Sequence, residues 1–504
     1  MSELALQAIL AVVQPDLLLL LAGSVIVGIV AGCLPGISAT MGVAVVSPLT
    51  FTMDPFSGIV ALLGIYTGAV YGGSISAILL GIPGTPGAVA TVLDGYTLGR
   101  KGFAGRALGV ATISSFIGGV FATVALALLA YPIATFALSF GPREYLALAF
   151  FALTAVATLS GGSALRGGIS ALIGMFMATI GIDEMYGSSR FHFGEMALFA
   201  GIPFIPAIIG LFAVPETLVN IERISSRRRR SLAVDRVLPG FTLLRSLLPA
   251  QFRSAGIGTI VGAVPGTGSD IAAIVAYSQG RNFSRQPERF GTGCEEGIAC
   301  PEAGNNAAVG GTMIPLLTLG IPGGAVTAII LGAFMTHGLR PGPLLLQNDA
   351  DLVYKIFAGL FVANLMLLAF GLAGARLFAR VIRVRDAILA PIVLMLCIVG
   401  SFALNNSVYD VLIMASAGML GYAMVKTDIP RAPLVIGLII GPMVERELTR
   451  TLLVVGDDWA SLFTPISAVI WVLALLPFVW PLFRRSLAGR FGIRARGAAP
   501  DGGR

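Results

Sequence analysis

The sequence predicts an all-α protein that crosses a membrane many times, and three observations support this fold class. Of the 504 residues, 56% are hydrophobic and 12% are charged, whereas about 25% are charged in ordinary soluble domains. Apolar runs near the roughly 20 residues that a spanning helix needs recur from Leu17 to Phe483. The same order of interrupted runs occurs twice. We therefore expect about 11–12 spanning segments plus half helices, arranged as two repeats with helices or re-entrant hairpins broken at Pro-Gly.

Residues 1–215 form the first predicted transmembrane repeat, in which the apolar runs are broken twice. A helix near Leu17–Ala31 meets Pro35-Gly36, and a half helix follows to Phe51. The run 64–84 stops at Gly81-Ile82-Pro83-Gly84, where proline removes a backbone donor and glycine allows left-handed turns. A short helical piece is expected to follow to about Leu98. Further spans are predicted for residues 107–130, 145–159, 167–182 and 196–213.

A charged linker, 216–253, separates this repeat from a second one at 254–456. Pro265-Gly266 follows Pro35-Gly36 at an offset of 230 residues, and Gly320–Gly323 repeats Gly81–Gly84 letter for letter at an offset of 239. Paired Gly/Pro interruptions at matching places in two halves indicate a secondary-transporter binding site near the bilayer midplane. The alternative is that Gly and Pro are simply common in membrane helices. Spans are predicted for residues 352–375, 387–402, 411–425 and 432–455, and residues 457–504 form an extra C-terminal helix and a basic tail.

The basic residues predict the orientation and argue against a nucleic-acid partner. Lys and Arg number 33 against 26 Asp and Glu, a net charge of +7, and most of them lie between apolar runs, as the positive-inside rule describes. Arg227–Arg230 in the linker is predicted to be cytoplasmic, and the acidic N-terminus to lie outside. If the first half crosses the membrane an odd number of times, the second half begins on the opposite side, and the two repeats are then inverted relative to each other. The C-terminal arginines predicted to be cytoplasmic are Arg484, Arg485, Arg490, Arg494 and Arg496.

Small hydroxyl residues follow each Pro-Gly break. A half helix that begins there directs its free N–H groups and the positive end of its dipole at the break, which suits a carboxylate. The predicted substrate is therefore an organic anion, although ordinary N-capping also explains such hydroxyls. The predicted substrate-binding residues are Pro35, Gly36, Ser38, Thr40, Gly84, Thr85, Pro265, Gly266, Thr267, Gly268, Ser269 and Gly323.

Acidic and amide side chains of the second half are the predicted cation-coupling residues. Glu302, Asn305 and Asn306 stand at i, i+3 and i+4, so they share one face of a helix, and Asp270 follows the break at Pro265. Hard oxygen ligands suit Na⁺, which we predict at Asn305, Asn306 and Asp270, whereas an isolated intramembrane acid suits H⁺. Alternatively, Asp270 or Glu302 is a solvated charge at the water boundary. No cofactor is predicted, because the four cysteines lack metal spacing.

Other roles fit the sequence less well. An ATP-driven pump is disfavoured because no G-x-x-x-x-G-K-[ST] motif occurs. Tyr409-Asp410 and Gly266–Asp270 resemble the two motifs of intramembrane aspartyl proteases, but Ser269 intervenes and would rotate Asp270 by about 100° on a helix. An organic-anion channel or exporter is the non-enzyme alternative. Interfacial snorkelling is the expected role of three arginines that follow apolar runs, Arg143, Arg166 and Arg190.

The second-half block Glu296-Gly297…Pro301-Glu302…Asn305-Asn306…Gly320-Ile321-Pro322-Gly323 resembles the signature of the large membrane subunit of tripartite tricarboxylate transporters, the TctA family. Leu34-Pro35-Gly36 and Tyr71-Gly72-Gly73-Ser74 are also similar to that family, and the resemblance extends to about Phe483. Ser38 is one departure, since glycine often follows the Pro-Gly there. The resemblance implies a non-enzymatic permease of the bacterial inner membrane, driven by an ion gradient. It also implies carboxylate substrates such as citrate and two partners, a small TctB-type membrane subunit and a periplasmic TctC-type solute-binding protein.

Overall fold

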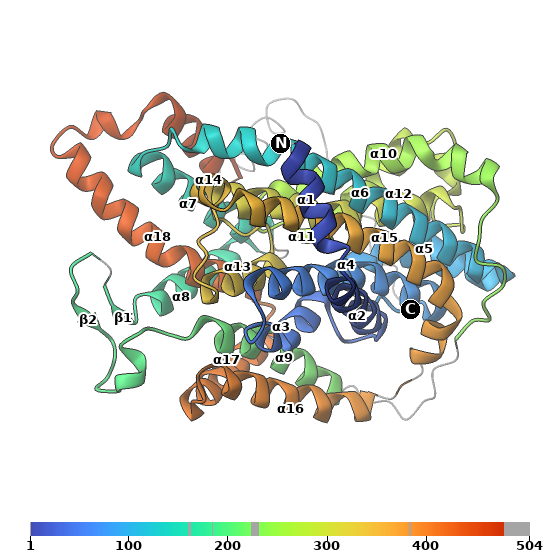
Figure 1. The fold of residues 1–504 in the computed structure, drawn as a ribbon, viewed down its shortest axis with the longest axis horizontal. Coiled ribbons are helices and arrows are strands. Elements are labelled where there is room, and N and C mark those ends of the chain that lie inside the picture. The colour runs from blue at the N-terminus through green and yellow to red at the C-terminus, as the bar shows by residue number, and fades with distance from the viewer. Residues whose placement is uncertain are drawn as a thin grey trace, which may run out of the picture.

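The computed structural model describes residues 2–159, 163–183, 185–222, 231–382, 384 and 386–477, and these are helical almost throughout (Figure 1). The elements up to Glu222 are α1 (Ser2–Val12), α2 (Pro15–Cys33), α3 (Ala39–Thr50), α4 (Pro55–Leu80), η1 (Pro86–Ala88), α5 (Val89–Leu98), η2 (Gly99–Phe103), α6 (Ala104–Ala137), α7 (Pro142–Leu159), α8 (Ala164–Ala178), β1 (Gly181–Ile182), β2 (Ser189–Arg190), η3 (Met196–Leu198) and α9 (Phe204–Glu222). The strands β1 and β2 pair antiparallel.

The later elements follow a similar order. They are α10 (Phe241–Ala263), α11 (Gly268–Phe283), η4 (Pro287–Arg289), α12 (Glu296–Leu319), α13 (Ala325–Thr336), α14 (Pro343–Asn348), α15 (Ala350–Val381), α16 (Asp386–Asn405), α17 (Val408–Lys426), α18 (Arg431–Val455) and η5 (Trp459–Leu462).

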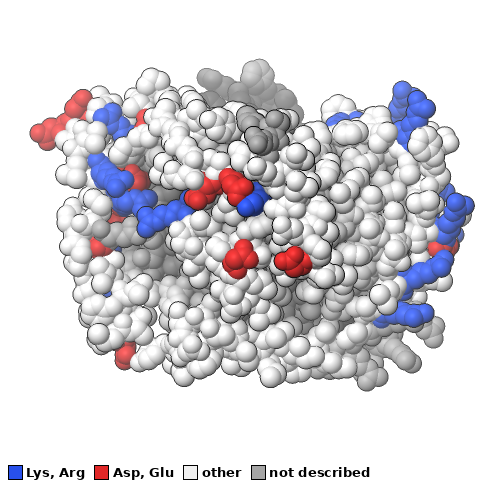
Figure 2. Space-filling model, viewed as in Figure 1, with Lys and Arg blue, Asp and Glu red and all other residues white. Residues whose placement is uncertain are grey.

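Membrane-spanning character is clear from length and composition. Among the described residues, 8 helices are long and apolar enough to cross a membrane, and shorter apolar helices include α3, α8 and α13. In the view of Figure 2 most of the surface is neither acidic nor basic, and basic side chains gather toward the two ends of the long axis. The predicted all-α, multi-pass membrane class is confirmed, whereas the number of crossings stays a prediction.

The predicted helix breaks are present, with matching backbone geometry. Gly81 and Gly320 end α4 and α12 with φ of 71° and 72°, and Gly36 and Gly266 have φ of 96° and 83°. L-residues with a side chain rarely adopt such positive φ, so glycine is needed at these turns. The two halves therefore share an order of helix, break and half helix, while an inverted relation between them stays a prediction.

Small residues let the paired helices of each half approach closely. A Cβ added to Gly28 or Gly32 on α2 would lie 2.3 or 2.0 Å from a backbone oxygen of α4, and one added to Gly258 on α10 would lie 2.2 Å from the oxygen of Gly304 on α12. Close backbone contact through small residues is typical of membrane helices. The α2–α4 and α10–α12 pairs are thus built alike.

The two broken helices form the centre of the protein. Nearly all residues of α4 and α12 are buried. Helix α6 packs against both of them, and α15 packs against α4 and α6. Asp94 on α5 fastens the start of α12, because its carboxylate accepts the backbone N–H groups of Gly293 and Cys294 at 2.7 and 2.9 Å. The halves therefore share one core.

Some boundaries differ from the sequence predictions. The helix expected from residue 196 begins at Phe204, because 181–203 form the β1–β2 hairpin, η3 and loops. The range 216–253, predicted as a linker, includes the end of α9 and the first part of α10. Arg227–Arg230 lies outside the described residues, as do the C-terminal arginines and the end of the extra helix beyond residue 477.

Candidate functional site

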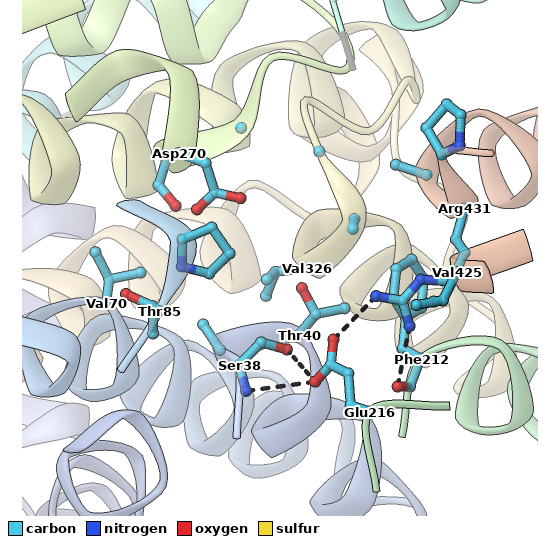
Figure 3. Close-up of a pocket in the computed structure, with 18 of the residues that line it drawn as sticks. Ser38, Thr40, Val70, Thr85, Phe212, Glu216, Asp270, Val326, Val425 and Arg431 are labelled. Carbon is cyan, nitrogen blue, oxygen red and sulfur yellow. Dashed lines mark hydrogen bonds and ion pairs between the residues drawn. The ribbon is translucent and has the colours of Figure 1, made fainter. Parts of the chain in front are cut away.

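The half helices that follow the two Pro-Gly breaks begin at one cavity of about 720 Å³ (Figure 3). Its walls come from both halves of the chain: the starts of α3, α11 and α13, the η1 turn, and parts of α8, α9 and α18. Helix starts present free backbone N–H groups and a partial positive charge. The residues predicted for substrate binding or coupling that line this cavity are Ser38, Thr40, Thr85, Gly268, Ser269 and Asp270.

The start of α3 already holds a carboxylate. The Ser38 hydroxyl accepts the Met41 N–H at 3.1 Å, so Ser38 is an N-cap as the alternative interpretation required. The same hydroxyl donates to Oε2 of Glu216 at 2.8 Å, and the Ser38 N–H points to that oxygen at 3.4 Å. Capping and anion binding therefore coexist at this helix end.

Arg431, at the start of α18, holds Glu216 from the other side. Its guanidinium donates to Oε1 of Glu216 at 3.2 Å and to the Leu211 carbonyl at 3.1 Å, and it lies 5.2 Å from the ring centre of Phe212. Both charged side chains are mostly buried, with 18% and 19% exposed. Sequence reasoning missed both residues, because it assigned Glu216 to a linker and gave Arg431 no role.

The start of α11 is arranged differently. The Thr267 hydroxyl donates to the carbonyls of Val261 and Val264, and the Gly266 and Gly268 N–H groups donate to the Gly323 carbonyl at 2.9 and 3.3 Å. These bonds join the break after α10 to the break after α12. Asp270 then lies in the first turn of α11 and faces the cavity, on the opposite side from Glu216 in Figure 3.

The predicted break residues outside the main cavity frame it. Gly36 and Gly84 line an adjoining space of about 290 Å³ that shares Ser38, Thr85 and Glu216 with the main cavity. Thr85 is 4% exposed, and its hydroxyl has no hydrogen-bond partner in the described part of the chain. Pro35 lines a separate small pocket. Pro265, Gly266, Thr267 and Gly323 shape the second break.

Glu302 is fully buried on α12, away from the cavity lining. Its carboxylate accepts hydrogen bonds from Thr91 on α5 and, at 2.9 Å, from Ser115 on α6. The interpretation of Glu302 as a solvated charge at the water boundary is therefore wrong. Within the described residues it has no ion-pair partner.

Asn305 and Asn306 lie on the same helix and are 1% and 0% exposed. All four of their amide N and O atoms are without a hydrogen-bond partner among the described residues. Asn305 faces η1, since a Cβ on Gly87 would lie 2.5 Å from its Oδ1, and η1 packs against both α11 and α12. Buried amides without a hydrogen-bond partner are rare in proteins and often lie at functional positions.

The three arginines expected to snorkel at the interface have different surroundings. Arg166 lines the main cavity, 3.8 Å from Oδ2 of Asp428, and is 49% exposed. Arg143 donates to the Ser461 carbonyl at 2.7 Å. Arg190 binds both carboxylate oxygens of Glu445 at 2.5 and 2.9 Å. Snorkelling therefore does not describe Arg190.

The two aspartates of the protease alternative do not meet. Asp410 lies in the first turn of α17 and accepts a hydrogen bond from Asn405, whereas Val425 near the other end of α17 lines the cavity with Asp270. Asp410 and Val425 are about 22 Å apart along α17 at 1.5 Å per residue. Asp410 does not line the cavity that Asp270 faces, so the structure does not support a catalytic aspartate pair.

Comparison with known proteins identifies the family. The model of the tripartite tricarboxylate transporter TctA family matches residues 17–436. An uncharacterized 52.8 kDa protein in the TAR-I ttuC' 3' region of Agrobacterium vitis is 37% identical over 466 residues, which cover 90% of this chain and 92% of that protein. Another uncharacterized protein, in the TAR-II ttuC' 3' region of the same organism, is 35% identical over 230 residues, 44% of this chain and 95% of that protein. No solved structure matches. The chain belongs to the tripartite tricarboxylate transporter TctA family.

Proposed function

We propose that this chain is the large permease subunit of a binding-protein-dependent secondary transporter in the bacterial inner membrane, which imports a tricarboxylate or another carboxylate with Na⁺ or H⁺. Its family consists of transporters rather than enzymes and belongs to tripartite systems. The partners in this proposal are a small membrane subunit of the TctB type and a periplasmic solute-binding protein of the TctC type.

The observation that carries the proposal is the carboxylate of Glu216 at the start of α3. Ser38 and Arg431 together supply that carboxylate with hydroxyl, backbone and guanidinium donors. A substrate carboxylate needs the same donors. The cavity of about 720 Å³ next to it has room for a small organic acid.

Coupling is assigned to the acidic and amide groups of the second half. The buried oxygens of Asn305 and Asn306 are hard ligands without partners in the described chain, which suits Na⁺. Asp270 contributes a negative charge from the cavity side of η1. Glu302, bonded to two hydroxyl groups, is the intramembrane acid that suits H⁺.

Uptake into proteoliposomes tests the proposal. The chain would be reconstituted with its small membrane partner and solute-binding protein, and offered labelled citrate, a dicarboxylate and an aromatic acid. Sodium and proton gradients would be imposed separately. We expect uphill accumulation of one acid with one of the two gradients, which identifies the coupling ion and the substrate together.

Other outcomes would replace the proposal. Equilibration that never exceeds the outside concentration and ignores both gradients would favour an organic-anion channel. Loss of preloaded acid against its gradient would favour an exporter. In the channel case the coupling roles given to Asp270 and Asn305 would be withdrawn.

A further inference from the structure

A second cavity of about 270 Å³ lies along the same four helices as the first one. The first cavity contacts α8 at Arg166, α9 at Phe212, α13 at Val326 and α18 at Arg431. The second contacts the same helices further along, at Met177, Phe204, Met335 and Leu438. The two cavities therefore occupy different levels of one helix group.

The helix positions give the separation between the cavities. Phe212 and Phe204 are eight residues apart on α9, and Val326 and Met335 are nine apart on α13, which corresponds to about 12–14 Å along the helix axes. Helix α18 packs against α8, α9 and α13, and α13 packs against α9. Residues at intermediate levels, Ile208, Ile330 and Leu434, belong to one hydrophobic cluster. An apolar layer thus separates the cavities.

An ion pair spans the second cavity. Arg190 of the β1–β2 hairpin binds Glu445 of α18 through two oxygens, at 2.5 and 2.9 Å, and both side chains line the cavity. Asp183 adds a second carboxylate 3.9 Å from the guanidinium. Bidentate pairs of this kind are among the strongest and most directional polar contacts. The pair joins the hairpin to α18.

The first cavity is also lined by the mostly buried Arg431–Glu216 pair, but its arginine from α8 makes a much looser pair. Arg166 of α8 approaches Asp428 at 3.8 Å, and these side chains are 49% and 88% exposed, against 30% and 32% for Arg190 and Glu445. Each cavity therefore has an arginine from the α8–β2 segment opposite an acid from the α17–α18 segment. The Arg190–Glu445 pair is close and bidentate, whereas Arg166 and Asp428 are further apart and more exposed.

The hairpin end has an uncommon backbone. Phe191 and Phe193, just after Arg190, have φ of 50° and 51°. Bulky L-residues rarely adopt this left-handed conformation, which is found at segments that switch between arrangements. The backbone that follows Arg190 is therefore strained, at the end of the hairpin that the ion pair holds against α18.

We propose that the second cavity is the opposite-facing vestibule of the carboxylate path, and that the Arg190–Glu445 pair keeps it closed while the first cavity is open. The inference rests on the proposed transport function. Alternating access needs one end of the path closed whenever the other is open. Opening of this pair admits the substrate to the second vestibule.

Neutralising either partner tests the gate in proteoliposomes. R190A and E445Q are expected to lose at least about tenfold of uphill accumulation, because a path open at both ends leaks, and to speed downhill carboxylate flux without an ion gradient. The charge exchange R190E/E445R, combined with D183N to remove the neighbouring carboxylate, restores accumulation. A matched control, D351A, removes the Lys355–Asp351 pair of 2.5 Å on α15 and leaves both fluxes unchanged. Wild-type accumulation by R190A and E445Q, or loss of accumulation without a leak, would overturn the gate.

Cysteine labelling gives a readout that needs no substrate. Leu438 lines the second cavity and is 7% exposed, and the four native cysteines are buried. A membrane-impermeant thiol reagent should label L438C at least about tenfold faster when E445Q is also present, because the ion pair no longer closes the cavity. Equal labelling rates would contradict the gate even if no carboxylate is ever found to accumulate, so the two proposals fail separately.

Discussion

The two helix breaks at the main cavity share a backbone design but differ in their charge. At the first break the start of α3 holds the carboxylate of Glu216, which comes from α9 and is 178 residues away in sequence. At the second break the start of α11 carries its own carboxylate, Asp270, in the first turn. A negative charge stabilises each helix start, but only the first one comes from a different helix.

The same difference appears on the central helices. At the 239-residue offset, Glu302, Asn305 and Asn306 of α12 correspond to Leu63, Tyr66 and Thr67 of α4. The repeats therefore duplicate the helix breaks and the helix starts that follow them, whereas of the two central helices only α12 carries acidic and amide side chains. We interpret the first half as contributing mainly to substrate binding and the second half as contributing the residues that couple transport to the ion.

The largest effect is expected when the second break loses its charge. D270N keeps the size of the side chain and removes the negative charge that faces the cavity. Ion-coupled uptake should fall about 100-fold, as expected for one lost charge-assisted contact of about 1.5–3 kcal/mol, while folding and insertion persist. Labelled-substrate accumulation measures uptake. Gel filtration of the purified variant checks that it is folded. D16N, at an exposed first-turn acid of α2, is the control. Unchanged uptake by D270N would remove Asp270 from the site.

The second-largest effect is expected when the amide side chains of Asn305 and Asn306, on the helix that packs against η1, are removed. The pair N305A/N306A should remove most ion-coupled uptake, though less than D270N does. It should cost little stability, because none of the four amide atoms has a partner in the described residues. Sodium-dependent uptake and thermal unfolding in detergent are the measurements. N405A serves as control, since Asn405 is exposed and its amide donates to Asp410. A large fall in Tm for the Asn305/Asn306 variant would instead indicate a structural role.

The third prediction concerns Glu216, whose carboxylate is present at the first break and not at the second. Because Glu216 occupies the donors that a substrate carboxylate needs, E216Q should lower the apparent KM for the carboxylate about threefold by removing a like charge and releasing Arg431. Initial uptake rates over a range of concentrations give the KM. E195Q, at an exposed acid bonded to Tyr409, should leave it unchanged. A raised KM for E216Q would mean that Glu216 positions Arg431 rather than competing with the substrate.

The local sequence predicted the helix breaks because Gly permits positive φ and Pro removes a backbone hydrogen-bond donor. Gly81 and Gly320 adopt nearly the same positive φ, and the i, i+3, i+4 spacing placed Glu302, Asn305 and Asn306 on the same helix, α12. Both features depend on neighbours in the chain. The joint binding of one Na⁺ by Asn305, Asn306 and Asp270 depends on how η1, α11 and α12 pack, and it stays a prediction.

The residues that sequence reasoning missed are fixed by distant contacts. Glu216 and Arg431 are 215 residues apart and meet only because α9 and α18 pack together. Arg190 lies in a short hairpin between two apolar runs, and its partner Glu445 is 255 residues away. Nothing in the local composition distinguishes these charges from solvated ones. The signal available was a charge at the end of an apolar run, which also describes an interfacial side chain.

The smallest effect should come from the hydroxyl that caps α3. S38A removes the acceptor for the Met41 N–H and one donor to Glu216, and loss of such a cap costs about 1 kcal/mol. In a protein of this size that corresponds to a fall in Tm of about 2 °C or less. S38T keeps the hydroxyl and should restore most of the loss, as measured by thermal unfolding in detergent. Because Glu216 remains bound to Arg431 in S38A, uptake should change far less than in D270N. A loss of uptake as large as that of D270N would show that the α3 start, rather than the charge at α11, dominates the site.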